Sequence, residues 1–251
     1  MSVLDLDGSL RDKRVLVTGG ASGIGAAMCD AFAGKGATIA VVDLDGDAAT
    51  RRAKALGSAR SYACDVSDAA DVARTVDAAV AEMGGIDVLV NCAGIVDLAP
   101  AAEIGPDAWR RTIDVNLTGS FNMAQAVGRQ MIAAGAGRII NMASQAGTVA
   151  IDGHVAYCAS KFAVIGMSKT MALEWGPLGL TVNTISPTVV LTELGRKAWD
   201  GPKGEAMLRE IPVGRFAEPE EIAAAALFLA SDMAAMINGA DLIIDGGFTI
   251  K

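Results

Sequence analysis

The chain has 251 residues, 52% of them apolar, and a net charge of −8 at pH 7. Nucleic-acid binding requires clustered Lys and Arg, so an acidic chain with 21 dispersed basic residues argues against a nucleic-acid partner. Residues 1–13 are charged and lack an apolar core, and no stretch of about 18 uncharged apolar residues follows. We therefore expect no signal peptide, no membrane contact, and a single domain spanning residues 1–251.

The four cysteines indicate a reducing compartment. Cys29, Cys64, Cys92 and Cys158 show no C-x-x-C spacing and fall on expected helices and strands. Reduced thiols are typical of the cytoplasm, which is the expected location, and no metal site is expected.

In chain order, the first informative element is a strand, a glycine-rich turn and a helix. Residues 14–17 are apolar enough for a buried strand, and an apolar helical pattern follows the turn at 18–25. Gly19, Gly23 and Gly25 permit a tight turn and a close backbone approach to a phosphate, while the helix N-terminus offers free amides to the anion. The spacing is Gly-x-x-x-Gly-x-Gly, which differs from the G-x-G-x-x-G fingerprint and is weak evidence alone.

The next strand ends at Asp43, eighteen residues beyond Gly25. A carboxylate there can accept hydrogen bonds from the adenosine ribose hydroxyls and repels a 2′-phosphate. No basic residue directly follows Asp43, so NAD is favoured over NADP as the cofactor. The alternative is that Asp43 is a solvated strand end or a helix cap.

Strands and helices are expected to alternate through the chain. The strands are predicted at 14–18, 38–43, 60–64, 87–91, 137–142, 181–185 and 241–244. This order indicates an α/β fold, a Rossmann-like, doubly wound parallel sheet of about seven strands with helices on both faces. The candidate site residues at the carboxyl ends of the strands then gather at one edge, where open α/β sheets bind ligands. These residues are Asp43, Asp65, Asn91, Ser144 and Pro187.

A phenol and an ammonium group lie four residues apart at Tyr157 and Lys161, on a helix predicted over 156–175. A tyrosine titrates near ~10, and a neighbouring positive charge favours its phenolate, so the pair can supply a base. Ser144, thirteen positions upstream of Tyr157, would complete a site that exchanges a proton with an alcohol or a carbonyl. The alternative is that the two side chains only pack against the helix.

Together these residues resemble the short-chain dehydrogenase/reductase family over nearly the whole chain. Further matches are Asp65-Val66, Asn91-Cys92-Ala93-Gly94, Asn116, the segment 187–192 and Asp245-Gly246-Gly247. Cys92 and Thr188 stand where the family has asparagine and glycine, and Thr188 puts in doubt how closely the backbone approaches the nicotinamide. The resemblance implies that NAD is bound by Gly19, Ser22, Gly23, Ile24, Gly25, Asp43, Asp65, Val66, Asn91, Ala93, Gly94, Tyr157, Lys161, Pro187, Val190 and Thr192.

The resemblance also implies a role for each catalytic residue. Ser144 and Tyr157 hold the reacting oxygen, and Tyr157 is the base. Lys161 lowers the pKa of Tyr157 and binds the nicotinamide ribose, while Asn116 kinks a helix and holds a water that links Lys161 to solvent.

Substrate recognition is expected in the less regular segment 191–212, which resembles the family's mobile lid. Trp199 in this segment either excludes water above the substrate or packs the lid onto the core. Asp152 and His154, just before Tyr157, are candidates to line the pocket, although a lone histidine is more often structural.

Within the family, the segments around Tyr157 and 186–195 are similar to bacterial sugar-alcohol dehydrogenases. This resemblance implies a small polyol or its ketose as substrate and favours a tetritol such as D-threitol. Two rival functions are a 3-oxoacyl-thioester reductase of the same family, against which Asp43 argues, and a catalytically silent cofactor sensor. The family further implies a homotetramer, built through helices near 120–134 and 156–175 and through the C-terminal strand.

Overall fold

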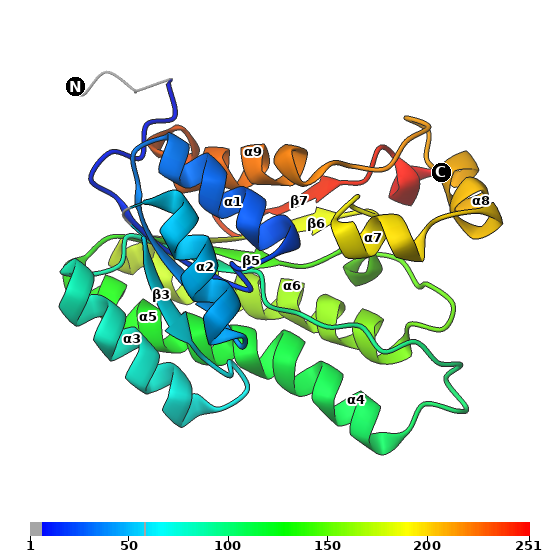
Figure 1. The fold of residues 1–251 in the computed structure, drawn as a ribbon, viewed down its shortest axis with the longest axis horizontal. Coiled ribbons are helices and arrows are strands. Elements are labelled where there is room, and N and C mark those ends of the chain that lie inside the picture. The colour runs from blue at the N-terminus through cyan, green and yellow to red at the C-terminus, as the bar shows by residue number, and fades with distance from the viewer. Residues whose placement is uncertain (1–6, 58) are drawn as a thin grey trace.

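A computed structural model describes residues 7–57 and 59–251 of the chain. Its centre is one sheet of seven parallel strands in the order β3-β2-β1-β4-β5-β6-β7 (Figure 1). The strands are β1 (Arg14–Thr18), β2 (Thr38–Asp43), β3 (Arg60–Ala63), β4 (Val88–Asn91), β5 (Gly137–Met142), β6 (Leu180–Pro187) and β7 (Asp241–Ile244). The predicted α/β fold with seven strands is confirmed.

Helices cover both faces of the sheet. They are α1 (Gly23–Gly34), α2 (Gly46–Leu56), α3 (Ala69–Met83), α4 (Pro106–Ile113), α5 (Ser120–Ala134), α6 (Val155–Trp175), α7 (Glu193–Ala198), α8 (Pro202–Glu210) and α9 (Pro219–Ala230). Short 3₁₀ turns occur at Gln145–Gly147, Gly176–Leu178, Asp232–Ala234 and Phe248–Ile250. Asp45 and Asp68 begin α2 and α3 as caps, because their carboxylates accept hydrogen bonds from amides of the first turn.

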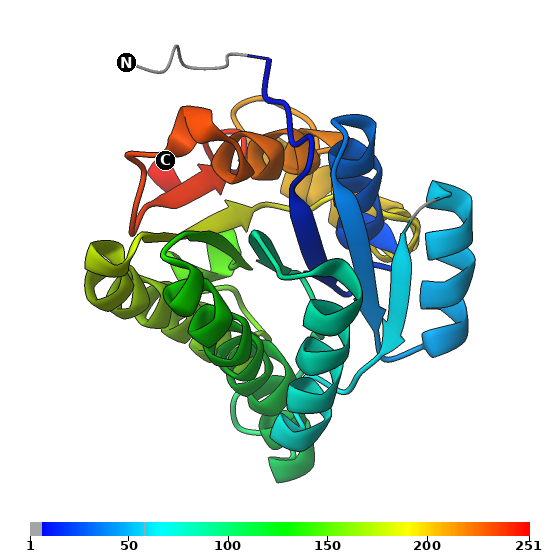
Figure 2. The ribbon, with the colours of Figure 1, turned by 90° about the vertical axis from the view of Figure 1, so that its left-hand side faces the viewer.

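The alternation of side chains along each strand divides the core into two layers. Val15 and Val17 of β1 pack with Met28 of α1 and Leu229 of α9, whereas Leu16 between them belongs to the opposite layer. That second layer joins the sheet to α3, α5 and α6. Figure 2 shows the two groups of helices on opposite sides of the sheet. Buried strands of this kind are apolar on both faces, which explains their continuous apolar sequences.

The predicted bounds 14–18, 38–43, 137–142 and 241–244 are the observed ones, and the other three strands differ from prediction by one or two residues at an end. β6 continues to Pro187, beyond the predicted end at 185, because Ser186 and Pro187 still pair with Ile243 and Ile244 of β7. The extension carries β6 further toward the edge of the sheet where the site lies.

Two features shape that edge. The chain runs from β1 outward to β2 and β3 in one direction and from β4 to β7 in the other, so a crevice opens between β1 and β4. Between α4 and α5, residues Asp114–Gly119 form a π-helical turn. Figure 1 shows α7 and α8 at the same end of the molecule as the C-terminus.

No helix in the described ranges combines the length and apolarity needed to cross a bilayer.

Candidate active site

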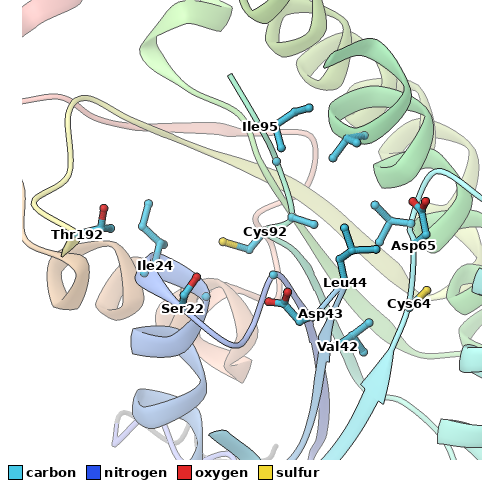
Figure 3. A pocket seen from close by; sticks show the side chains of 17 residues that line it. Ser22, Ile24, Val42, Asp43, Leu44, Cys64, Asp65, Cys92, Ile95 and Thr192 are labelled. Atoms are coloured by element: carbon cyan, nitrogen blue, oxygen red, sulfur yellow. The ribbon is translucent and has the colours of Figure 1, made fainter. Parts of the chain in front are cut away.

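A cavity of about 370 Å³ lies at the crevice between β1 and β4. It collects most of the residues expected to bind the cofactor (Figure 3), namely Gly19, Ser22, Gly23, Ile24, Gly25, Asp43, Asp65, Val66, Ala93, Gly94 and Thr192. In Figure 3 Asp65 lies toward one side, Ile24 and Thr192 lie toward the other, and Asp43 lies between them. The structure brings these predicted residues together because they lie near the carboxyl ends of strands or near the starts of helices.

The glycine turn at the floor of this cavity leaves no room for side chains. A Cβ atom at Gly25 would lie 2.2 Å from the carbonyl oxygen of Gly19, and one at Gly19 would lie 3.0 Å from the backbone of Ala93. Gly19 and Gly23 also have φ of +62° and +53°, which favours glycine. Ser22 precedes α1 without a side-chain cap, so the first amides of the helix are free to bind an anion. This cradle fits the pyrophosphate of a dinucleotide.

Asp43 is fixed against the glycine turn. Its carboxylate accepts hydrogen bonds from the amide of Ala21 at 3.1 Å and from the amide of Asp45 at 3.2 Å. The side chain is half-buried and lines the cavity. Among the described residues that line this cavity, none is a lysine or an arginine. A negative charge held in this way suits ribose hydroxyls and opposes a phosphate.

A second cavity of about 550 Å³ adjoins the first and contains Ser144, Tyr157 and Lys161. The two cavities share the residues Ile24, Cys92, Gly94, Ile95 and Thr192. Lys161 is almost fully buried, and its ammonium donates a hydrogen bond to the carbonyl oxygen of Met142 at 2.7 Å. The ammonium also lies 5.5 Å from the centre of the Tyr157 ring. The predicted proximity of the phenol and the ammonium is therefore present.

Burial shifts the pKa values of both Tyr157 and Lys161, whereas the sequence predicted only that Lys161 lowers the pKa of Tyr157. Burial raises the pKa of the Tyr157 phenol, and the hydrogen bond to Ser144 opposes this by lowering it. Burial lowers the pKa of Lys161 to about 8. The hydrogen bond to Ser144 is the contact that lowers the pKa of Tyr157 against the effect of burial. The sequence could not reveal this, because burial depends on the complete packing around the pair.

Asn116 lies in the π-helical turn and is completely buried. Its amide donates to the carbonyl oxygen of Ile95 at 2.9 Å and to Oγ of Ser160 at 3.1 Å, and its oxygen accepts from the amide of Ile95 at 2.8 Å. Asn116 thus ties the loop after β4 to α6, next to Lys161. π-Turns of this kind are common at functional sites.

Two other predicted residues lie near the catalytic group without lining the cavity. His154 is bonded through Nδ1 to the carbonyl oxygen of Asp152 at 2.7 Å, and its ring is edge-on to that of Tyr157 with centroids 6.2 Å apart. Asp152 itself is exposed. Trp199 does line the second cavity, where its ring lies 6.0 Å from that of Phe216 and 4.7 Å from Nζ of Lys203.

The remaining predicted cofactor residues divide into two groups. Pro187 and Val190 line the second cavity. Asn91 does not line either cavity; its side chain is buried and donates to Oδ1 of Asn141 at 2.8 Å and to the carbonyl oxygen of Ser120 at 3.1 Å, which links β4 to its neighbours. The lining residues that sequence reasoning missed as site residues include Leu44, Cys92, Ile95, Val96, Val115 and Thr188. Most are apolar or small, and their types carry no signal of a binding role.

Comparison with known proteins agrees with this geometry. The family described as Enoyl-(Acyl carrier protein) reductase matches residues 19–249. D-threitol dehydrogenase of Mycolicibacterium smegmatis is 62% identical over 99% of this chain and 97% of its own length. NAD-dependent glycerol dehydrogenase of Listeria innocua is 48% identical over 98% of both chains. The structure of a gluconate 5-dehydrogenase from Burkholderia cenocepacia, in complex with NADP and tartrate, superposes with a TM-score of 0.93 at 38% identity and covers 97% of this chain and 98% of that one. The chain therefore belongs to the short-chain dehydrogenase/reductase family, whose members use NAD or NADP as cofactor.

Proposed function

We propose that the protein is an NAD-dependent oxidoreductase that interconverts a small polyol and its ketose at a secondary alcohol. A tetritol such as D-threitol is the favoured substrate. The observation that carries the proposal is the junction of the two cavities, because it sets Ser144 and Tyr157 directly beside the expected cofactor site. The names of the similar D-threitol and glycerol dehydrogenases support a polyol.

The residues of the second cavity can carry the proton transfer. Ser144 and Tyr157 bind the alcohol oxygen, and Tyr157 accepts its proton as the carbonyl forms. A bound nicotinamide dinucleotide supplies the hydride acceptor. Lys161 and Asn116 hold the base and the loop after β4 in place, and Lys161, with a pKa of about 8, can exchange a proton near neutral pH. A positioned acid–base group contributes roughly 10²–10⁴ in rate.

NAD is the proposed cofactor because Asp43 is held against the glycine turn and no basic side chain accompanies it in the described lining of the cavity. The preference for NAD over NADP is argued from Asp43 and the cavity lining, because one similar protein is NAD-dependent and another is in complex with NADP.

Segment 191–212 is proposed to close over the substrate within a single domain of residues 1–251. α7 and α8 occupy this segment, and Trp199 between them lines the second cavity. Asp152 and His154 remain candidates for contact with a substrate that extends toward the mouth of the cavity. Four free thiols support a cytoplasmic location.

A homotetramer is proposed from the apolar surfaces of the described chain. Phe121 of α5 and Phe162 and Leu173 of α6 are exposed, and a groove of about 540 Å³ runs between these helices. β7 is an edge strand whose Ile243 is also exposed. Surfaces of this kind mark protein interfaces. Light scattering should give four times the 25.6 kDa of one chain, and a monomer at micromolar concentration would refute this assembly.

The experiment for the proposed function is NADH formation against a panel of tetritols, hexitols, simple secondary alcohols and 3-hydroxyacyl thioesters. We expect tetritols to give the highest kcat/KM. Preference for the thioesters would identify a 3-oxoacyl-thioester reductase, and cofactor binding without turnover on any substrate would identify a sensor.

A further inference from the structure

Thr188 directly follows β6 and stands where the family has a glycine. Its amide donates to the carbonyl oxygen of Ile244 at 3.0 Å, so it continues the pairing of β6 with β7. Among the described residues, Asp12 is the only one other than glycine with a positive φ. Thr188 therefore occupies backbone space open to any residue, and the conformation does not require the family's glycine. The side chain is free to serve another purpose.

The hydroxyl of Thr188 has no partner. The residue is 9% exposed, and Oγ1 is buried without a hydrogen bond from the described chain. Burying a hydroxyl without a partner is unfavourable, so such an atom calls for an explanation. Among the described residues, three other buried side-chain atoms lack a hydrogen-bond partner. They belong to Arg52, Asn91 and Gln145, none of which lines either cavity. Thr188 alone among these four residues lines the cavity of Ser144 and Tyr157.

Three other polar side chains of that cavity already have hydrogen bonds to the protein backbone. Ser144 accepts from the amide of Ala146 at 3.1 Å. Lys161 donates to the carbonyl oxygen of Met142, and Thr192 accepts from the amide of Gly195 at 3.0 Å. The Thr188 hydroxyl is buried in this lining without a protein partner, and it is available for a ligand beside the hydroxyls of Ser144 and Tyr157.

The sheet places Thr188 close to the reacting centre. β5 and β6 are paired through Met142 and Ile185, and the amide of Ala143 bonds to the carbonyl oxygen of Ile185 at 2.8 Å. Thr188 follows β6 directly, Ser144 is the second residue after β5, and both line the second cavity. The Cβ atom of threonine bears a hydroxyl and a methyl group, and one step between staggered rotamers exchanges them. The covered Oγ1 can therefore turn into the cavity.

We propose that Thr188 determines specificity for polyols by hydrogen bonding to a second substrate hydroxyl, on the carbon adjacent to the one oxidised. This inference rests on the proposed polyol dehydrogenase function. Ser144 and Tyr157 bind the reacting oxygen, and Thr188 binds its vicinal neighbour from the adjoining strand. A site that hydrogen-bonds a substrate hydroxyl discriminates against an analogue that lacks it.

The test compares 2,3-butanediol with 2-butanol, which differ in the adjacent hydroxyl, in the parent enzyme and in Thr188→Val and Thr188→Ser. Valine preserves the shape of threonine without its hydroxyl, and serine keeps the hydroxyl. We expect Thr188→Val to lower the ratio of kcat/KM for the diol to that for 2-butanol by about tenfold, and D-threitol turnover to fall with it. Thr188→Ser should keep most of the parent ratio. Thr148→Val, at an exposed threonine outside both cavities, should leave the ratio as in the parent.

NADH affinity, measured by fluorescence titration, separates the alternatives. An unchanged ratio in Thr188→Val, or a loss of NADH affinity that accounts for its lower activity, would overturn the assignment while leaving the proposed function intact. If the parent enzyme oxidises 2-butanol but neither the diol nor any polyol, the proposed function and this inference both fail.

Discussion

The ammonium of Lys161 lies 5.5 Å from the centre of the Tyr157 ring and donates a 2.7 Å hydrogen bond to the carbonyl oxygen of Met142. The lysine is thus held beside the phenol by the end of β5, with 4% of its surface exposed. Both members of the pair are shifted by burial, the pKa of Lys161 downward to about 8 and that of Tyr157 upward. Because both groups are titratable and buried together, we expect stability and catalysis to depend on pH through this pair.

The buried lysine should reduce stability in a pH-dependent way. Below about pH 8 Lys161 is charged in both the folded and unfolded states, and the folded protein bears the full cost of burying the charge. As pH rises from about 8 to the unfolded pKa near 10.5, that cost disappears. Lys161→Met should therefore be more stable than the parent at pH 7, by up to about 3 kcal/mol, with the difference vanishing toward pH 10.5.

Urea unfolding of this variant at pH 7 and pH 9.5 provides the measurement. Lys169→Met is the matched control, because Lys169 lies on the same helix and is exposed. The control should show no such pH-dependent gain. A Lys161→Met variant that is less stable than the parent by the same amount at both pH values would contradict the burial argument.

Ser144 should set the pH range of catalysis. Alcohol oxidation needs the Tyr157 phenolate, so kcat/KM should rise with pH and ketose reduction should fall. The hydrogen bond from Ser144 lowers the pKa of Tyr157, and Ser144→Ala removes it. The rise in oxidation should then move to higher pH, in addition to an overall loss of rate. A profile with the parent's midpoint would show that Ser144 does not influence the phenol.

Asp43 should decide cofactor preference. Asp43→Ser is expected to relieve repulsion of the 2′-phosphate and to weaken NAD binding by roughly 1–3 kcal/mol, because a charged hydrogen-bond partner is lost. Asp43→Asn is the matched variant, since its amide oxygen can still accept the hydrogen bond from Ala21 that the carboxylate accepts at 3.1 Å. If charge is the cause, both variants should gain NADP activity, and asparagine should retain more NAD affinity. Equal use of NAD and NADP by the unmodified enzyme would refute the role of Asp43.

Asn116 should act as a positioning residue through its three side-chain hydrogen bonds to Ile95 and Ser160. Asn116→Ala leaves buried partners unsatisfied, so we expect a stability loss of about 1–3 kcal/mol together with a lower kcat and a displaced pH profile. Asn238→Ala is the control, because Asn238 also bridges two backbone groups, Val182 and Ala172, but lies outside both cavities. It should lose stability while keeping the pH profile. Identical profiles in the two variants would make Asn116 purely structural.

Much of this site could be predicted from the sequence, because strand ends, glycine turns and helical spacing are local signals. The glycine turn, Asp43, Ser144 and the Tyr157–Lys161 pair follow directly from such patterns. The direction of the Tyr157 pKa shift could not be predicted, because burial of the phenol depends on distant packing.

Thr188 illustrates a different limit of sequence reasoning. The sequence shows only that Thr188 replaces the family's glycine, which put in doubt how closely the backbone approaches the nicotinamide. The structure shows a backbone without positive φ and a hydroxyl without a partner, and both facts require the tertiary arrangement of β6 and β7. The hydrogen bonds of Asn116 also could not be read from the sequence, because they join it to Ile95, twenty-one residues away in the chain.

Tyr157→Phe tests the central assignment most directly. The phenyl ring preserves the shape of the side chain and removes the one group able to accept the substrate proton, so turnover of D-threitol should be abolished while NADH binding, followed by fluorescence, stays close to that of the parent. The parent should show oxidation rising with pH. Substantial turnover in Tyr157→Phe with the parent's pH profile would show that the Tyr157–Lys161 pair is structural and that another group is the base.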